Sequence, residues 1–315
     1  MNGYIKHTLI ATILLSLAFF LIPGSLAASQ NDKEISFGIA PGPYGDLITK
    51  AIKPGLEEKG YTVTLVQFQD YVQPDLALAN GETRANLFQH VPYLEQFSKD
   101  HKLNLSPVVS VPTAGLGIYS HKIKSLSELK KGDEVTLAND PTNLARALRF
   151  LQKLGLIKIN PNIDAAKASE KDITENPIGL TITPLDAAQI PRTLDTVAIA
   201  VVNGNYAIAA GINLSSAIAK EQLDDNLKIV VAVRTEDQNQ QFVKDIKDVV
   251  ESEGFHQAVE NSPVFSSFQK PDWYVNKWGA SAKAVAKWNG RGMNGLLELR
   301  HSAKAPRDTR PGIRN

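Results

Sequence analysis

The chain has no cysteine among its 315 residues. This absence excludes a disulfide scaffold, a thiol nucleophile, a CxxC redox motif and a metal site built from thiolates. A thioether-linked lipid anchor also requires a cysteine at the processed N-terminus, so we expect no lipid anchor.

The chain also lacks an excess of charge of either sign, with 34 Lys and Arg residues against 33 Asp and Glu and a net charge of +1. A nucleic-acid-binding protein normally carries a clear basic excess, so we expect no nucleic-acid partner. The six histidines are scattered, which argues against a metal site. A glycine-rich phosphate loop, a GxSxG motif and a paired-carboxylate signature are all missing, so we predict neither an enzyme nor a bound cofactor.

Only one long apolar run occurs, Leu9–Ile22, and it follows the single charge of Lys6. Its 14 residues are short for a bilayer core of about 30 Å. A Pro-Gly pair and the small residues Ser25–Ala28 follow, in the order that signal peptidase reads. We therefore predict a signal peptide over residues 1–27, cleaved after Ala27 or Ala28, and a periplasmic protein.

The near-neutral charge is a sum of two unequal parts. Residues 282–315 hold eight basic and two acidic residues, whereas residues 28–281 hold 25 basic and 31 acidic ones. The C-terminal part is rich in Gly, Arg and Pro, and we expect a flexible basic extension there.

Strands and helices are predicted to alternate through the mature chain, which indicates an α/β fold with parallel sheets. Two strands, 196–202 and 227–234, are apolar enough to be buried strands of the parallel type. The other expected strands are 34–40, 61–66, 85–88 and 134–138, and the expected helices are 44–60, 76–81, 92–100 and 142–154.

About 250 residues lie at the upper limit of a single hydrophobic core, so two lobes are expected. The natural breaks are the polar stretches 120–126 and 221–226. Residues 28–121 plus 229–281 would form one lobe and residues 122–228 the other. A small ligand would bind in the cleft between the two lobes.

The strongest local signal is Asn139–Arg146, where a strand runs into a helix. Asp140 is a predicted N-cap and Pro141 takes the first helical position. Such a helix start favours an anion, and the planar fork of Arg146 suits a carboxylate. An ordinary capped helix with Arg146 in a surface salt bridge is the equal alternative.

Aromatic and amide side chains gather in a second segment of the first half. Tyr71, Phe88, His90 and Tyr93 could enclose an apolar side chain and supply a few hydrogen bonds. They could equally be core aromatics, with His90 a structural imidazole.

A third segment ends a buried strand in Asn203-Gly204-Asn205. The amide of Asn203 both donates and accepts, so it could bridge the ammonium and carboxylate groups of a ligand. It could also be a simple turn residue, because Asn-Gly is common in turns.

Taken in order, seven segments carry a family resemblance that runs from about Glu34 to Trp273. They are FQDY (68–71), ANLFQHVPYL (85–94), NDPTNLAR (139–146), LQKLGLIK (151–158), ENP (175–177), QIPRTLD (189–195) and VVNGNYA (201–207). Together they resemble the methionine-binding NlpA lipoprotein family, the substrate-binding components of ABC importers.

The resemblance implies a two-lobed periplasmic-binding-protein fold, type II-like, that closes over free L- or D-methionine. Arg146 would hold the α-carboxylate and Asn203 would anchor the amino-acid head group. Tyr71, Phe88, His90 and Tyr93 would line the side-chain pocket, with Asn143 nearby. The implied partner is an ABC permease in the inner membrane, met by a freely diffusing monomer.

Two departures from the family pattern accompany the resemblance. The lipobox cysteine of the family is absent, and the strand 227–234 has Val230 where the family often supplies an asparagine. The loss of a polar contact could weaken methionine binding or indicate another amino acid or a short peptide. A surface or structural protein without a transport role is the remaining alternative.

Overall fold

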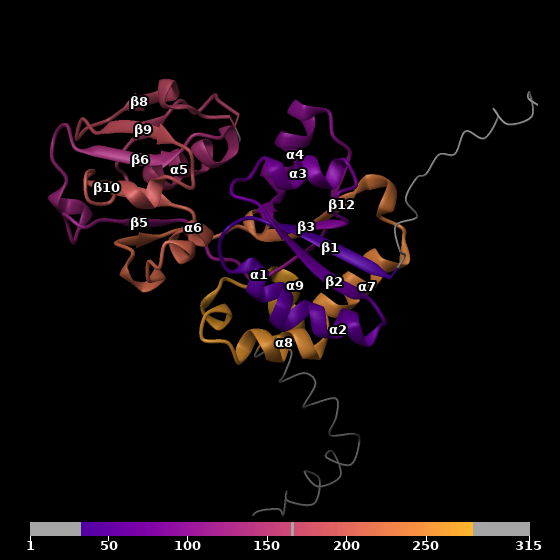
Figure 1. The fold of residues 1–315 in the computed structure, drawn as a ribbon. Helices are drawn as coiled ribbons and strands as arrows, with labels where there is room; N and C mark the ends of the chain where they lie inside the picture. Colours follow the sequence, from indigo (N-terminus) through magenta and orange to yellow (C-terminus); the bar gives the residue numbers. More distant parts are fainter. Residues whose placement is uncertain (1–32, 165–166, 280–315) are drawn as a thin grey trace, which may run out of the picture. The chain divides into compact units, whose positions relative to one another are not determined.

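The computed structural model describes residues 33–164 and 167–279 (Figure 1). The predicted signal peptide and the predicted basic extension lie outside the described residues. The described chain forms a two-lobed α/β fold with two five-stranded sheets, each with its own hydrophobic core.

The first sheet combines four strands from the first half of the chain with one from the second half. Its order is β2 (Thr62–Gln67), β1 (Glu34–Ile39), β3 (Ala85–His90), β12 (Ile229–Arg234) and β4 (Leu105–Ser110). Strand β1 runs parallel to β3, whereas β12 is antiparallel to both of its neighbours.

The expectation that 227–234 is a strand of the parallel type is therefore wrong. Its apolar run reflects burial on both faces, since Val231 and Val233 belong to one core while Val230 and Ala232 pack on the other side. A central strand covered on both faces needs this composition whichever way it runs.

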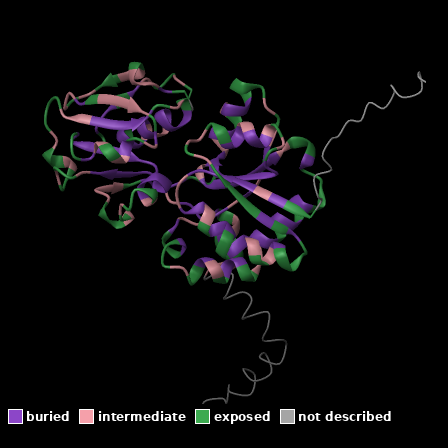
Figure 2. Ribbon diagram, viewed as in Figure 1, coloured by how far each residue is buried: buried purple, intermediate pink, exposed green. Residues whose placement is uncertain are grey.

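Helices cover the two faces of the first sheet. The larger core lies under a continuous run of α1 (Tyr44–Leu47), a π-helix (Ile48–Ile52) and α2 (Lys53–Glu58), together with α7 (Gln241–Val250), α8 (Glu253–Glu260) and α9 (Asp272–Trp278). The other side carries α3 (Gln73–Ala79) and α4 (Val91–His101). Figure 2 shows these helices buried on their inner sides and exposed on their outer sides.

The second sheet has the order β11 (Ala219–Lys220), β5 (Gly117–Tyr119), β10 (Ile199–Val202), β6 (Glu134–Ala138) and β9 (Thr181–Leu185). Strand β10 is parallel to β6 and antiparallel to β5. Helices α5 (Pro141–Lys153) and α6 (Gly204–Ala209) follow β6 and β10 directly. Because β5 pairs here, the chain enters the second sheet before Gly117, ahead of the break expected after residue 121.

Smaller elements complete the described chain. Strands β7 (Lys158–Ile159) and β8 (Ile173–Glu175) form a two-stranded sheet. Single turns of 3₁₀-helix occupy Leu126–Glu128, Glu170–Asp172, Ile190–Thr193, Leu214–Ser216, Asp225–Leu227, Thr235–Asp237 and Phe265–Ser267. Among the helices of the described residues, none is long and apolar enough to cross a bilayer.

Candidate functional site

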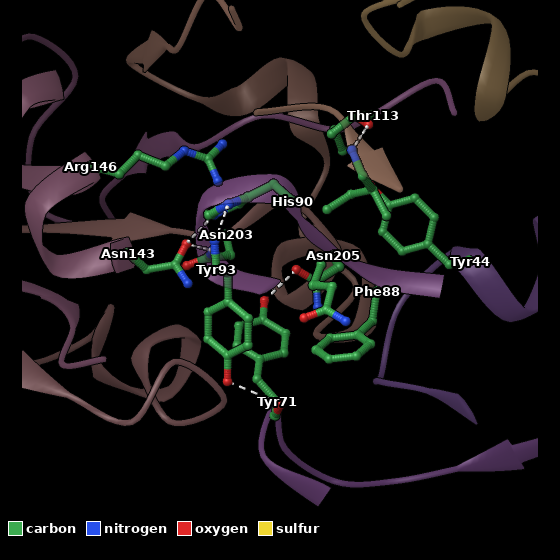
Figure 3. A pocket seen from close by; sticks show the side chains of 14 residues that line it. Tyr44, Tyr71, Phe88, His90, Tyr93, Thr113, Asn143, Arg146, Asn203 and Asn205 are labelled. Atoms are coloured by element: carbon green, nitrogen blue, oxygen red, sulfur yellow. Dashed lines mark hydrogen bonds between the residues drawn. The ribbon is translucent and has the colours of Figure 1, made fainter. Parts of the chain in front are cut away.

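One cavity gathers all seven residues that the sequence singled out (Figure 3). The space between its walls is about 370 Å³, including the open solvent at its mouth. The seven are Tyr71, Phe88, His90, Tyr93, Asn143, Arg146 and Asn203, and the lining also includes Tyr44, Gln89, Thr113, Ala114, Gly204, Asn205 and Ile229.

The end of β3 and the start of α4 fix His90. Its Nδ1 accepts a hydrogen bond from the backbone N–H of Tyr93, which caps α4, so the proton is on Nε2. Nε2 lies 3.3 Å from Oδ1 of Asn143 and donates to it. Burial and the charge of Arg146 lower the pKa of His90 to about 3, so the ring is neutral. His90 therefore caps a helix, and it also lines the cavity.

The start of α5 is capped by its own carboxylate. The Asp140 side chain accepts from the backbone N–H of Asn143 at 3.0 Å, as the sequence predicts. It also accepts from the Asn143 side-chain amide at 3.1 and 3.0 Å. The anion expected at this helix start is therefore replaced by Asp140 itself, and the amide of Asn143 is held rigidly.

Asn203 follows β10 and leaves one polar atom unused. Its Nδ2 donates to Oδ1 of Asn143 at 3.0 Å, whereas its buried Oδ1 has no hydrogen-bond partner. An unpaired buried acceptor costs about 1–3 kcal/mol unless a donor meets it. A ligand ammonium group in the cavity would be such a donor.

Arg146 makes a buried ion pair with Glu221. Its Nε donates to Oε1 at 2.9 Å and its Nη2 to Oε2 at 2.6 Å, with both side chains less than one-tenth exposed. The backbone N–H of Leu116 holds the same carboxylate at 3.0 Å. Within the described residues Nη1 makes no hydrogen bond, so one edge of the guanidinium is available to a ligand. The alternative of a surface salt bridge is wrong, since the pair is buried.

The aromatic side chains form a contiguous wall. The ring of Tyr71 lies 5.8 Å from Phe88, 5.9 Å from Tyr93 and 5.0 Å from Tyr206, measured between centroids. The Tyr71 hydroxyl donates to Oδ1 of Asn205 at 2.7 Å, and the Tyr93 hydroxyl donates to the Tyr71 carbonyl. These hydroxyls are satisfied within the protein, so the wall offers mainly apolar surface to a ligand.

The strand position that reaches the cavity is Ile229, not Val230. Ile229 lines the cavity, while Val230 packs against Leu78 and Leu94 on the other side of the sheet. A register shift in the β12 ladder after Val230 accompanies this arrangement. Ile229 therefore places an apolar side chain at that point of the cavity.

Sequence reasoning missed Glu221 and Asn205, two residues that complete the site. Glu221 lies 75 residues from Arg146 and reaches it only through the fold. Asn205 could have been found, since it lies beside Asn203 in the motif, and its Nδ2 bonds the Pro41 carbonyl at 2.9 Å. In the described part of the chain, no group of three or more His, Asp or Glu side chains could hold a metal ion.

Two α/β lobes with a cavity that offers an aromatic wall and an unpaired guanidinium edge define a small-molecule-binding protein. A family model of NlpA lipoproteins matches residues 35–273, and the chain belongs to this family. This is a family of substrate-binding transport proteins.

Individual relatives cover most of the chain. It is 38% identical to the D-methionine-binding lipoprotein MetQ of Salmonella typhi, over 79% of this chain and 94% of that protein. It is 38% identical to outer membrane lipoprotein 3 of Mannheimia haemolytica, over 72% and 86% respectively. Among solved structures, a nutrient-binding protein of Burkholderia cenocepacia bound to methionine is 37% identical, with a TM-score of 0.69, over 72% of this chain and 95% of that one.

Proposed function

We propose that the protein is the extracytoplasmic solute-binding protein of an ABC importer, which captures free methionine and delivers it to a permease in the inner membrane. The relatives named for methionine binding support this proposal. The observation that carries it is the pair of unused polar atoms in the cavity, Nη1 of Arg146 and Oδ1 of Asn203, opposite an aromatic wall.

The roles of the residues follow from these contacts. The Arg146 Nη1 edge holds the α-carboxylate by a charge-assisted hydrogen bond, and Asn203 Oδ1 accepts from the ammonium. Asn143 keeps the Asn203 amide in place. Tyr71, Phe88, His90 and Tyr93 surround the thioether chain, which gains from burial and from contact between sulfur and aromatic rings.

The proposal also covers the state of the protein in the cell. The protein is a monomer that binds its ligand without turnover and moves freely in the periplasm after cleavage of its signal peptide. The absence of any cysteine in the sequence supports the lack of a lipid anchor. Of the described residues, 33–116 and 229–279 form one lobe and 117–164 and 167–228 form the other, a division that strand pairing supports.

A thermal-shift and calorimetric titration with L- and D-methionine tests the function. Methionine at one hundred times its Kd should stabilise the protein by about 2.7 kcal/mol. The double variant Arg146→Met/Glu221→Gln removes both charges of the buried pair together, and we expect it to fold and to lose methionine binding. If neither enantiomer shifts the wild-type melting temperature, the proposal is wrong.

A further inference from the structure

A second cavity adjoins the first and shares two residues with it. Its space is about 850 Å³, including its open mouth. His90 and Arg146 line both cavities, whereas Tyr71, Phe88 and Asn203 line only the first. The other residues of the second cavity are Pro92, Thr142, Arg149, Phe150, Lys153, Glu221, Gln222, Asp224, Asn226 and Leu227.

The shared residues show which end of a ligand faces the second cavity. The proposed function places the ligand carboxylate at Arg146, which belongs to both cavities. The aromatic wall at the other end of the ligand does not reach the second cavity. Extra length at the carboxyl end of an amino acid would therefore extend into this space.

Helix α5 presents two more basic residues along the same wall. Arg149 and Lys153 are three and seven residues beyond Arg146, on neighbouring positions of one helix face. At 1.5 Å per residue they lie about 4.5 and 10.5 Å further along the helix axis. One added peptide residue moves a terminal carboxylate by about 3.5 Å, which matches the step to Arg149.

Arg149 has no ion-pair partner among the described residues. It is half-buried, and no described carboxylate lies within ion-pair distance of its guanidinium. Desolvation by burial lowers its pKa, and Asp164 acts on it only at longer range. Of the acidic residues that line the cavity, Glu221 is paired with Arg146. The exposed Asp224 is then the remaining negative charge, and Arg149 and Lys153 are the remaining positive charges. The cavity thus keeps a positive excess beside the carboxyl end of the ligand.

We propose that the second cavity is a subsite for short peptides that begin with methionine, and that Arg149 binds their terminal carboxylate. In a dipeptide Met-X, the Arg146 Nη1 edge donates to the peptide carbonyl in place of the α-carboxylate. The side chain X lies against Pro92 and Phe150, and Lys153 serves the terminal carboxylate of longer peptides. This inference rests on the proposed function, which orients the ligand.

Titration calorimetry on the full-length protein with methionine, Met-Ala and Ala-Met tests the orientation. We expect Met-Ala to bind at least tenfold more tightly than Ala-Met, because only the former extends toward Arg149. Native mass spectrometry of the complex verifies that the bound dipeptide is intact. Equal affinity for the two dipeptides, or no binding of Met-Ala, would overturn the inference.

The variant Arg149→Gln tests the role of Arg149 in binding the terminal carboxylate. We expect it to weaken Met-Ala binding about tenfold, the effect of one partly exposed charge-assisted hydrogen bond, and to leave methionine binding unchanged. Met-Ala amide, which lacks the terminal charge, should bind the wild type as weakly as the variant binds Met-Ala. Lys124→Gln removes an exposed positive charge outside both cavities and is the matched control.

The outcomes separate this inference from the proposed function. Methionine binding together with an Arg149→Gln variant that binds Met-Ala normally would refute the subsite alone. A wild type that binds no form of methionine would refute the proposed function, and the inference would fall with it. An equal loss of Met-Ala affinity in Lys124→Gln would reduce the effect to general electrostatics and would also refute the subsite.

Discussion

The two walls of the main cavity differ in whether their polar groups already have hydrogen-bond partners within the protein. The aromatic wall of Tyr71, Phe88 and Tyr93 satisfies its own hydroxyl groups and stays apolar toward the cavity. The polar wall of Arg146 and Asn203 leaves one donor edge and one acceptor unused. The first wall is complete without a ligand, whereas the second is complete only with one.

The contrast indicates where affinity and selectivity originate. An aromatic surface accepts any apolar side chain of suitable size, so its discrimination by one methylene is modest. The polar wall meets fixed groups of an amino acid, and the loss of one partner leaves a buried polar atom unpaired. We therefore expect head-group chemistry to be recognised more strictly than the side chain.

The largest effect is expected from the loss of Glu221, the ion-pair partner of Arg146 in the polar wall. Glu221→Ala leaves the Arg146 charge buried without its partner, and we expect a loss of about 3–5 kcal/mol in the free energy of unfolding. Urea denaturation measures it. The double variant Arg146→Met/Glu221→Gln should recover most of this loss, and a single variant as stable as the wild type would contradict the importance of the pair.

A second prediction concerns the buried carboxyl group of Asp75 on α3. Asp75 accepts hydrogen bonds from the side-chain amides of Asn86 and Gln89 at 2.9 and 2.6 Å, and burial raises its pKa to about 7. Between about pH 4 and 6.5 the folded state therefore holds a proton on Asp75 that the unfolded state has lost, and this contribution to stability falls as pH rises.

His90 has the opposite sign in the same interval. Its pKa of about 3 in the folded state lies below the ordinary value of about 6.5, so the unfolded state binds the extra proton. This contribution rises with pH by up to about 1.4 kcal/mol per unit and offsets that of Asp75. We expect Asp75→Asn to show a stability that increases from pH 4.5 to 6 more steeply than the wild type, as measured by urea denaturation. Parallel profiles would contradict the raised pKa of Asp75.

The sequence predicted the features that depend on neighbouring residues, such as helix caps and the apolar patterns of single strands. The Asp140 cap depends on four consecutive residues, and the strands β1, β3 and β6 show their own apolar patterns. It missed the partner of Arg146, because Glu221 arrives from a distant segment. It also placed a polar contact of the family at Val230, whereas the neighbouring Ile229 lines the cavity and Val230 packs on the other side of the sheet.

The direction of β12 likewise could not be predicted from its own residues. Burial on both faces determines its composition, while its direction depends on where the chain returns from the second sheet. Strand β9 escaped prediction because Pro184 interrupts a short and only half-buried segment.

A third prediction removes the unused acceptor of the polar wall. Asn203→Ala deletes both its bond to Asn143 and the oxygen that we assign to the ligand ammonium. We expect methionine affinity to fall at least tenfold, the effect of about 1.4 kcal/mol, with little change in stability, because an unpaired buried acceptor is lost as well. Isothermal titration calorimetry measures the affinity, and an unchanged Kd would contradict the assigned role.

The smallest expected effect concerns the hydrogen bond between Tyr71 of the aromatic wall and Asn205 of the other lobe. Tyr71→Phe keeps the ring contacts but removes the donor to Asn205, and we expect a loss of about 1 kcal/mol in stability. Tyr93→Phe is the matched control, because its hydroxyl bonds Tyr71 within one wall. Titration with methionine separates the two variants. The Tyr71 variant should lose several-fold more affinity, since its lost bond joins residues from both lobes, whereas that of Tyr93 lies within one lobe. Equal losses in the two variants would show that the link contributes stability alone and has no part in holding the cavity closed around its ligand.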